Sequence, residues 1–178
     1  MNTLLETQLK RAKAAARLLK NMPTCTKNQA LEKIADALIA HSEEILEANK
    51  KDMAHAKEVN MTKAMQDRLL FTHERIVGVS DGVKKVATLP DPVGEVMESW
   101  TRPNDLEISK VRVPIGVFGI IYEARPNVTV DIASLCLKSG NACVLRGGKE
   151  AIHTNKKLVE IMKCATKDIL PEGAIELI

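Results

Sequence analysis

Apolar residues recur every three or four positions through the first ninety residues, which is the spacing of amphipathic α-helices. The first helix has Leu9 and Leu19 on its apolar face and ends before Pro23. Further helices are predicted in residues 31–58, which divide in two near Ser42, and in residues 63–70 and 73–89. The pattern therefore predicts a helical N-terminal region over residues 1–90.

Hydroxyl residues stand where several of these helices begin. A serine or threonine at an N-cap accepts a hydrogen bond from a free backbone N–H of the first turn. We expect Ser42, Thr62 and Thr72 to cap three helices, and either Thr24 or Thr26 to cap another. These caps would fix where each helix starts.

The pattern changes at "LPDPVGEV", where two prolines and a glycine close the helical part. Two segments of strand character follow, Val93 to Trp100 and Leu106 to Val113, on either side of the turn "RPND". Residues 91–113 are therefore predicted to form a β-hairpin.

Strands alternate with helices in the remaining segment, 114–178. Buried strands are predicted in "PIGVFGIIY" and "NACVLRG", a third strand in "GAIELI", and helices from Asn127 to Ser139 and from Ala151 to Lys167. Such alternation implies right-handed βαβ crossovers and a parallel sheet. The predicted fold class is therefore α/β: a helical N-terminal region, a β-hairpin, and a βαβαβ segment with a parallel sheet.

Composition argues against two classes of partner. Lysine and arginine alternate with aspartate and glutamate, so the net charge of +3 forms no basic stripe, and only 2% of residues are aromatic; we expect no nucleic-acid partner. The apolar runs are shorter than the roughly 20 residues of a membrane span, and the N-terminus lacks an apolar signal core. We therefore expect no membrane association and a cytoplasmic location.

Four cysteines are present, Cys25, Cys136, Cys143 and Cys164. They form no C-x-x-C pair and have no histidine in ligand register, so we predict neither a metal site nor a redox pair. We expect free thiols that are mostly buried, with Cys136 in a helix and Cys143 in a strand.

Two polar corners interrupt the apolar pattern of the predicted sheet. "YEARPN" follows its first strand and "RGGKE" follows its second. Ligands of parallel sheets bind at the carboxyl ends of the strands. Each corner also leads into a helix N-terminus, whose free backbone N–H groups favour anions. We therefore place the candidate site at these two corners.

The segment "VPIGVFGIIYEARPNVTVDIASLCLKSGNACVLRGGKEAIHTN" resembles the gamma-glutamyl phosphate reductase family of the aldehyde dehydrogenase superfamily, and "LEKIADAL", "DRL" and "DPVGEV" fit the same family. The resemblance implies NADPH-dependent reduction of L-glutamate 5-phosphate to L-glutamate 5-semialdehyde with release of phosphate, the second step of proline biosynthesis. In that family a cysteine thiolate attacks the acyl phosphate, and hydride from the nicotinamide reduces the resulting thioester.

The nucleophilic cysteine of that family lies in a second domain, in a Thr-Cys-Asn type of context that this sequence does not contain. The chain therefore resembles the N-terminal part of the reductase, with residues 114–178 as the first half of an NADP-binding domain and with the catalytic domain absent. We expect the chain by itself not to turn over.

The resemblance assigns the first corner to the substrate. Asn127 matches the asparagine whose amide stabilises the oxyanion of the tetrahedral intermediate, a donor worth about 3 kcal/mol in comparable sites. An asparagine between a proline and a helix is also a preferred N-cap, so a structural role stays open. Arg125 either pairs with Glu123 or binds a phosphate or carboxylate of the substrate bidentately.

The resemblance assigns the second corner to the cofactor, NADPH. Arg146 matches a basic residue that contacts the adenosine ribose, and Lys149 adds a second cation that suits a 2′-phosphate at the helix N-terminus. Gly147 and Gly148 give the backbone freedom for a sharp strand-to-helix turn, and Tyr122 completes the predicted cofactor-binding set. The G-x-G-x-x-G fingerprint is absent, and this superfamily holds its cofactor without it.

The hairpin resembles the oligomerisation element of the superfamily, so we expect a homo-oligomer, with functional coupling to glutamate 5-kinase. Two other functions stay open at this point. One is a non-catalytic module that binds an anion or a protein partner. The other is oxidation of free aldehydes by an NAD-dependent enzyme, against which "YEARPN" speaks because such enzymes have a Pro-Trp-Asn type of sequence there.

Overall fold

The computed structural model describes residues 3–178. The helices in that range are α1 (Thr3–Leu19), α2 (Thr24–Ala40), α3 (Ser42–Glu58), α4 (Lys63–Leu69), α5 (His73–Thr88), α6 (Pro126–Lys138) and α7 (Ile152–Thr166), with a 3-10 turn η1 (Lys149–Ala151). The strands are β1 (Val96–Thr101), β2 (Glu107–Val111), β3 (Val117–Ile121), β4 (Ala142–Arg146) and β5 (Ile175–Leu177). Every predicted helix and strand is therefore present, with ends shifted by a few residues.

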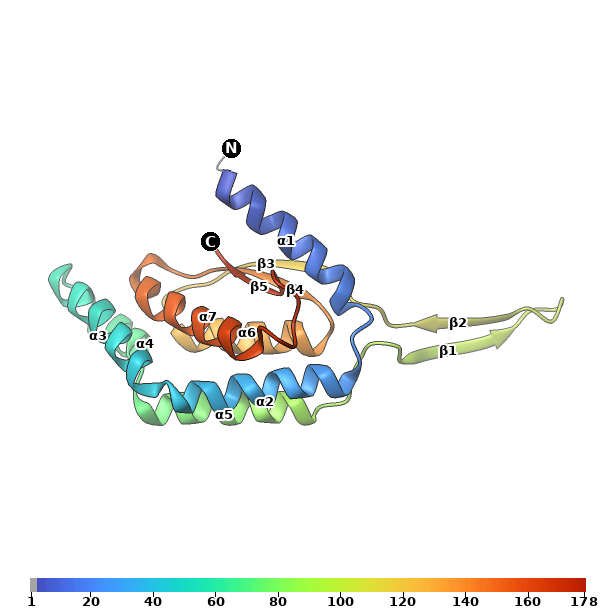
Figure 1. The fold of residues 1–178 in the computed structure, drawn as a ribbon, viewed down its shortest axis with the longest axis horizontal. Helices are drawn as coiled ribbons and strands as arrows, with labels where there is room; N and C mark the ends of the chain where they lie inside the picture. Colours follow the sequence, from blue (N-terminus) through green and yellow to red (C-terminus); the bar gives the residue numbers. More distant parts are fainter. Residues whose placement is uncertain (1–2) are drawn as a thin grey trace.

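The elements stack in four layers (Figure 1). α1 covers one face of the sheet formed by β3, β4 and β5, and α6 and α7 cover the other face. α2 and α5 pack together as an outer layer on α6 and α7. The sheet is parallel, in the order β3-β4-β5. The predicted α/β fold class is confirmed.

A single large hydrophobic core joins the helical region to the α/β segment. Its buried members include Leu19 and Leu31 from the first two helices, Val83 from α5, Leu137 from α6 and Leu145 from β4. Fully burying one such side chain contributes about 1.5–3 kcal/mol. The two segments therefore stabilise each other, and the division of the chain at residues 90 and 113 stays a prediction from the sequence.

The strands of the parallel sheet differ in burial. β4 is the central strand and is buried, as predicted. The same prediction for the first strand is wrong, because Ile115 and Ile121 are 78% and 82% exposed. β3 is the edge strand, and within residues 3–178 it pairs only with β4. An apolar run identifies a strand, but burial depends on neighbours that a local pattern does not reveal.

Two of the predicted helix caps are confirmed. The side chains of Thr62 and Thr72 each accept the backbone N–H three residues further on. Ser42 does not cap α3, because the helix already begins at Ser42 and the N-cap is His41, which has φ −106° and no side-chain cap bond. A hydroxyl inside the first turn cannot reach the free N–H groups as an N-cap side chain does.

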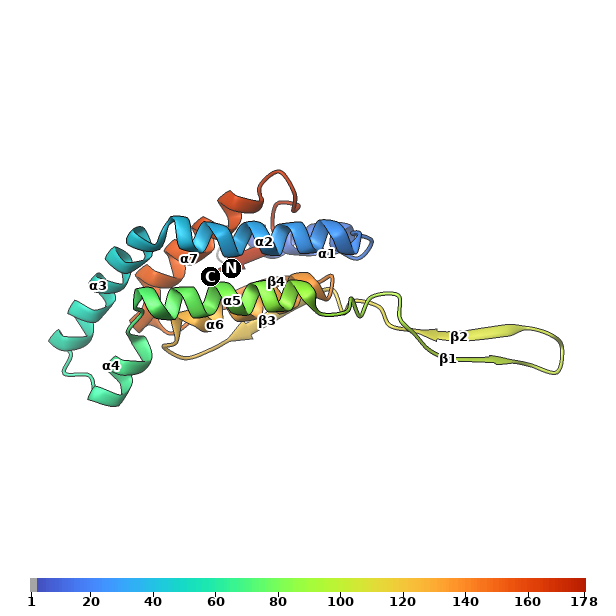
Figure 2. The ribbon, with the colours of Figure 1, turned by 90° about the horizontal axis from the view of Figure 1, so that it is seen from below.

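β1 and β2 form the predicted β-hairpin, which extends away from the body of the molecule (Figures 1 and 2). The strands pair antiparallel with Trp100 opposite Ile108, and every residue of β1 is exposed. Apolar side chains such as Val96, Met97 and Trp100 are among the exposed ones. An isolated two-stranded hairpin is only marginally stable in water. The exposed part of this hairpin therefore contributes little to the stability of the chain.

A buried ion pair fixes the base of this hairpin to α2. Lys27 is 1% exposed, and its Nζ lies 2.5 Å from Oδ2 of Asp91. Asp91 also accepts bonds from the Thr24 hydroxyl (2.6 Å) and the Val93 backbone N–H (3.0 Å). Neither Thr24 nor Thr26 caps α2, contrary to the prediction, because no side chain bonds its first turn. The Thr24 hydroxyl serves the hairpin base instead.

The pKa values of this cluster follow from burial and hydrogen bonding. Burial alone would raise the pKa of Asp91, but the bonds from Lys27, Thr24 and the Val93 N–H outweigh it, so the pKa is lowered. Lys138, at the end of α6, donates to the carbonyl of Ala87 (2.8 Å), and burial lowers its pKa while the Asp91 charge opposes that shift. The hairpin base is therefore a desolvated charge cluster joining α2, α6 and the segment after α5.

The cysteines divide evenly between core and surface. Cys136 on α6 and Cys143 on β4 are buried, as predicted. Cys25 and Cys164 are exposed, so the expectation of mostly buried thiols is wrong for them. They lie on the outward faces of α2 and α7, whose inward faces supply the core.

Among residues 3–178, no helix combines the length and the apolar character needed to cross a membrane.

Candidate functional site

The carboxyl ends of β3 and β4 bring the two polar corners together, as predicted. The Tyr122 backbone N–H donates to the Arg146 carbonyl oxygen at 3.0 Å. Gly148 lies against the first corner, since a Cβ built on it would be 3.2 Å from the backbone nitrogen of Ala124. The two corners therefore form one surface at this end of the sheet.

Asn127 is the second residue of α6 rather than its N-cap. The N-cap is Arg125, which has extended backbone and makes no side-chain cap bond, and Pro126 follows as the first helical residue. The Asn127 side chain instead donates from Nδ2 to Oδ2 of Asp131, one turn along the helix, at 3.0 Å. The N-cap interpretation of Asn127 is therefore wrong. Within the described residues, the second N–H of this amide has no acceptor.

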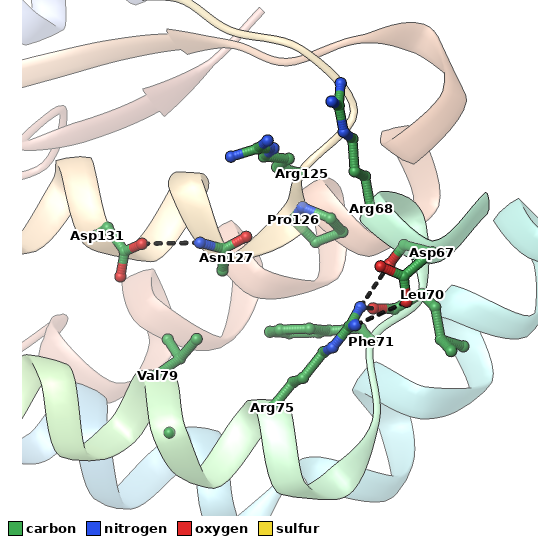
Figure 3. A pocket seen from close by; sticks show the side chains of 11 residues that line it. Asp67, Arg68, Leu70, Phe71, Arg75, Val79, Arg125, Pro126, Asn127 and Asp131 are labelled. Atoms are coloured by element: carbon green, nitrogen blue, oxygen red, sulfur yellow. Dashed lines mark hydrogen bonds and ion pairs between the residues drawn. The ribbon is translucent and has the colours of Figure 1, made fainter. Parts of the chain in front are cut away.

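Asn127 faces a cavity of about 580 Å³ between α6 and the α4–α5 segment (Figure 3). Asn127 and Asp131 follow one another along α6, and Arg75 extends from α5 toward Asp67 and Leu70. Arg125 and Arg68 also line the cavity. Three arginines, two aspartates and an amide donor thus line the cavity. An arginine left without an ion pair there is suited to a small anionic ligand.

The three arginines of this cavity differ in how fully they are engaged. Arg75 donates to the carbonyl oxygens of Asp67 (2.5 Å) and Leu70 (2.6 Å) and pairs with the Asp67 carboxylate at 2.9 Å. These bonds hold the segment between α4 and α5 in place, so Arg75 has a structural role in the cavity wall. Arg68 lies 4.0 Å from Glu123, and both side chains are mostly exposed. Arg125 forms no ion pair with a described residue. The predicted alternative of an Arg125–Glu123 pair is therefore wrong.

Asp131 is a half-buried carboxylate on the wall of the same cavity. Burial raises its pKa, and the hydrogen bond from Asn127 only partly opposes that shift. No cation among the described residues pairs with it. A carboxylate in this state is incompletely compensated, because burial removes water and one neutral amide replaces only part of the lost hydration.

A second cavity, of about 500 Å³, lies between the two corners and α4. Tyr122, Gly148, Glu150 and Arg68 are among the residues that line it. The Tyr122 hydroxyl lies 2.7 Å from Oγ1 of Thr129. Burial raises the pKa of this tyrosine, and the bond to Thr129 partly opposes the rise. Tyr122 therefore presents its ring, rather than a free hydroxyl, to the cavity.

Gly147 and Gly148 stand in tight packing rather than in a backbone conformation that favours glycine. Neither has a positive φ, so the predicted need for glycine's conformational freedom is wrong. A Cβ on Gly147 would overlap Nδ2 of Asn155 and lie 3.0 Å from the Tyr122 ring, and one on Gly148 would lie 2.5 Å from Oε2 of Glu150. The missing side chains let the second corner pack closely on its surroundings.

The N-terminus of α7 is already filled by a side chain of the protein. Asp52, a buried residue of α3, accepts the backbone N–H groups of His153 (3.1 Å) and Thr154 (2.8 Å) and the Thr154 hydroxyl (2.6 Å). Lys149 opens the 3-10 turn before α7, not α7 itself. The expectation that this helix N-terminus offers free N–H groups to an anion is therefore wrong. Arg146 and Lys149 are exposed and form no ion pair with a described residue.

The family of the chain follows from comparison with known proteins. The model of the aldehyde dehydrogenase family matches residues 3–178. The chain belongs to this family. Membership in the aldehyde dehydrogenase family implies a nicotinamide cofactor.

Gamma-glutamyl phosphate reductases are among the most similar members of the family. One from Clostridium novyi is 55% identical over 168 residues, which cover 94% of this chain and 40% of that protein. A solved reductase from Thermotoga maritima has a TM-score of 0.95 and 44% identity, over 98% of this chain and 42% of that one. The reductase from Saccharomyces cerevisiae has a TM-score of 0.91 and 36% identity, over 97% and 45%. The chain thus spans about two fifths of these relatives, and the predicted resemblance to the N-terminal part of a reductase is confirmed.

Three charged residues of this aldehyde dehydrogenase chain were missed at the sequence level. Asp131 could have been found, because it stands four residues after Asn127 and residues so spaced share one face of a helix. Glu150 stands in the quoted "RGGKE" corner, although no role was assigned to it. Arg68 had no local signal, since only the tertiary fold brings α4 beside the two corners.

Proposed function

We propose that the protein containing this chain reduces L-glutamate 5-phosphate to L-glutamate 5-semialdehyde with NADPH and releases phosphate, the second step of proline biosynthesis. The observation that carries the proposal is the cavity that contains the Asn127 amide and the unpaired Arg125, in a chain 55% identical to a reductase of that name. An acyl phosphate combines a carbonyl oxygen that needs an N–H donor with an anion that suits a guanidinium.

Two side chains of the cavity, Asn127 and Arg125, would contact the substrate directly. Asn127 Nδ2 keeps one N–H on Asp131 and donates the other to the substrate carbonyl oxygen as negative charge develops there. Arg125 binds the phosphate or the carboxylate of the substrate. No cysteine of residues 3–178 lines either cavity, so we place the nucleophilic thiolate in a second domain, as in the sequence-based expectation.

The second cavity is proposed as part of the NADPH site. When bound, this cofactor supplies the hydride. Gly148 and the Tyr122 ring form part of its wall. Gly147 lets the second corner pack closely, and Arg146 and Lys149, which stand in this corner outside the cavity lining, supply exposed positive charge. These residues fit a nucleotide whose phosphate is held by side chains rather than by the N-terminus of α7.

Arg146→Ala and Lys149→Ala are each expected to weaken NADPH binding roughly tenfold to a hundredfold, because each removes a charge-assisted contact worth about 1.5–3 kcal/mol. NADH lacks the 2′-phosphate and should bind almost as before. Dissociation constants for both nucleotides at one low salt concentration provide the measurement, with Lys156→Ala, an exposed lysine on α7, as the control. Equal losses for NADPH and NADH would show that Arg146 and Lys149 only shape the turn.

The proposed activity is tested most simply in reverse. A protein that contains this chain together with a reductase catalytic domain is expected to oxidise L-glutamate 5-semialdehyde with NADP⁺ only when inorganic phosphate is present. Oxidation that does not require phosphate would favour an ordinary aldehyde dehydrogenase. Nucleotide or phosphate binding without any turnover would favour a non-catalytic anion-binding module.

Assembly, coupling and location complete the proposal. The exposed apolar residues of the hairpin support a homo-oligomer in which another subunit covers them, because such a ribbon is marginal without a packed face. Coupling to glutamate 5-kinase would follow from the need to deliver a reactive acyl phosphate. We place this reaction in the cytoplasm.

A further inference from the structure

Asp131 is the carboxylate of the Asn127 cavity that has no cationic partner. The other carboxylate of the lining, Asp67, is paired with Arg75 at 2.9 Å. Asp131 accepts one bond, from the Asn127 amide to Oδ2, while its Oδ1 has no donor among the described residues. Burial of an uncompensated carboxylate costs free energy. A ligand that brings a cation to Oδ1 would remove part of that cost.

Asp131 lies beside Asn127 on the cavity wall, with its Oδ2 3.0 Å from Asn127 Nδ2. In L-glutamate 5-semialdehyde, four bonds separate the carbonyl carbon from the α-nitrogen. A substrate this short, with its carbonyl oxygen on the free N–H of Asn127, brings its α-ammonium group within reach of Asp131 Oδ1 when it lies along this wall.

Resting on the function proposed above, we infer that Asp131 binds the α-ammonium group of the substrate and selects α-amino acids over acids without the amine. Arg125, which also lines the cavity and has no ion pair within residues 3–178, is left for an anionic group of the same substrate. A carboxylate and a guanidinium on one cavity wall give the charge pattern of a zwitterionic amino-acid head group.

A purely orienting role for Asp131 is the competing interpretation, because Asp131 also holds the Asn127 amide. The two roles respond differently to Asp131→Asn. An asparagine at position 131 still offers a carbonyl oxygen to Asn127 Nδ2, so orientation of the amide is kept. It has no charge for an ammonium group, so amine recognition is lost.

The test compares two aldehydes in the enzyme that contains this chain with its catalytic domain. One is L-glutamate 5-semialdehyde and the other is 5-oxopentanoate, which is the same molecule without the α-amine. We expect Asp131→Asn to lower kcat/KM for the aminated aldehyde roughly tenfold to a hundredfold, mainly through KM, and to leave 5-oxopentanoate within about threefold of wild type. Variant-to-wild-type ratios are compared for each aldehyde, so differences in hydration or cyclisation cancel.

Controls separate the remaining outcomes. Asp81→Asn makes the same charge change at an exposed position of α5 and should alter neither ratio. Asp131→Ala provides a second variant if Asp131→Asn fails to accumulate, with the same preference for the amine-free aldehyde expected. Parallel losses on both aldehydes, or no loss on either, overturn the inference while the proposed function stands. A wild-type enzyme that is inactive on L-glutamate 5-semialdehyde with phosphate overturns both.

Discussion

Asn127→Ala is expected to lower kcat by about a hundredfold or more in the complete enzyme, because it removes the N–H that would stabilise the developing oxyanion. Stability should change by less than about 2 kcal/mol, since Asn127 is not the N-cap of α6 and its side chain makes a single bond, to Asp131. Steady-state kinetics together with thermal unfolding of the same preparation provide the measurement.

Two further results bear on the role of Asn127. Asn127→Asp keeps the size of the side chain and replaces the donor by an acceptor, so its kcat should fall at least as far as that of the alanine variant. Val128→Ala serves as the control for a small change in the same turn of α6. A large loss of stability with an unchanged kcat per folded molecule would contradict the oxyanion role.

Asp91→Ala is expected to destabilise the chain by about 3–5 kcal/mol, because it leaves the Lys27 ammonium buried without its partner. Urea unfolding of the 178-residue chain measures the difference. Asp36→Ala is the matched control: Asp36 pairs with Lys84 at 3.2 Å, but both side chains are more than half exposed, so the expected change is below about 1 kcal/mol. Similar values for the two variants would contradict the buried-pair assignment.

The sign of the pH dependence follows from the lowered pKa of Asp91. Although burial would raise this pKa, the hydrogen bonds to Asp91 hold it below the unfolded-state value of about 3.9. The stabilisation is therefore complete above that value and is lost as pH falls through the folded-state pKa. The double variant Lys27→Met with Asp91→Leu should recover most of the lost stability, since apolar residues often replace a buried pair without net cost.

Local sequence patterns were sufficient for the elements of this fold but not for its surface. The helix and strand periods identified every α-helix and β-strand of residues 3–178 but not the 3-10 turn η1, and Thr62 and Thr72 were identified as caps from residue type and position. The prediction that β3 is buried was wrong, because an apolar run does not reveal that its strand lies at the edge of a sheet. Exposure is a property of tertiary neighbours, which this pattern does not encode.

Local sequence patterns located the candidate site but did not reveal its charge partners. The two corners were located correctly because parallel strands end at the same side of a sheet. The free N-terminus expected for α7 is instead occupied by Asp52, a hundred residues earlier in the chain. A carboxylate delivered from α3 cannot be seen in the "RGGKE" segment itself. The partners of Arg68 and Asp131 likewise depend on which helices the fold places side by side.

α6 carries the charge cluster of the hairpin base at one end and Asn127 at the other. Its 13 residues form a continuous hydrogen-bonded rod about 20 Å long. Lys138 anchors the far end of this rod to the carbonyl of Ala87 and to Asn28. The hairpin base and the Asn127 amide are therefore joined by one continuous helix rather than by a flexible loop, so a displacement of the hairpin base would be transmitted along α6 to Asn127.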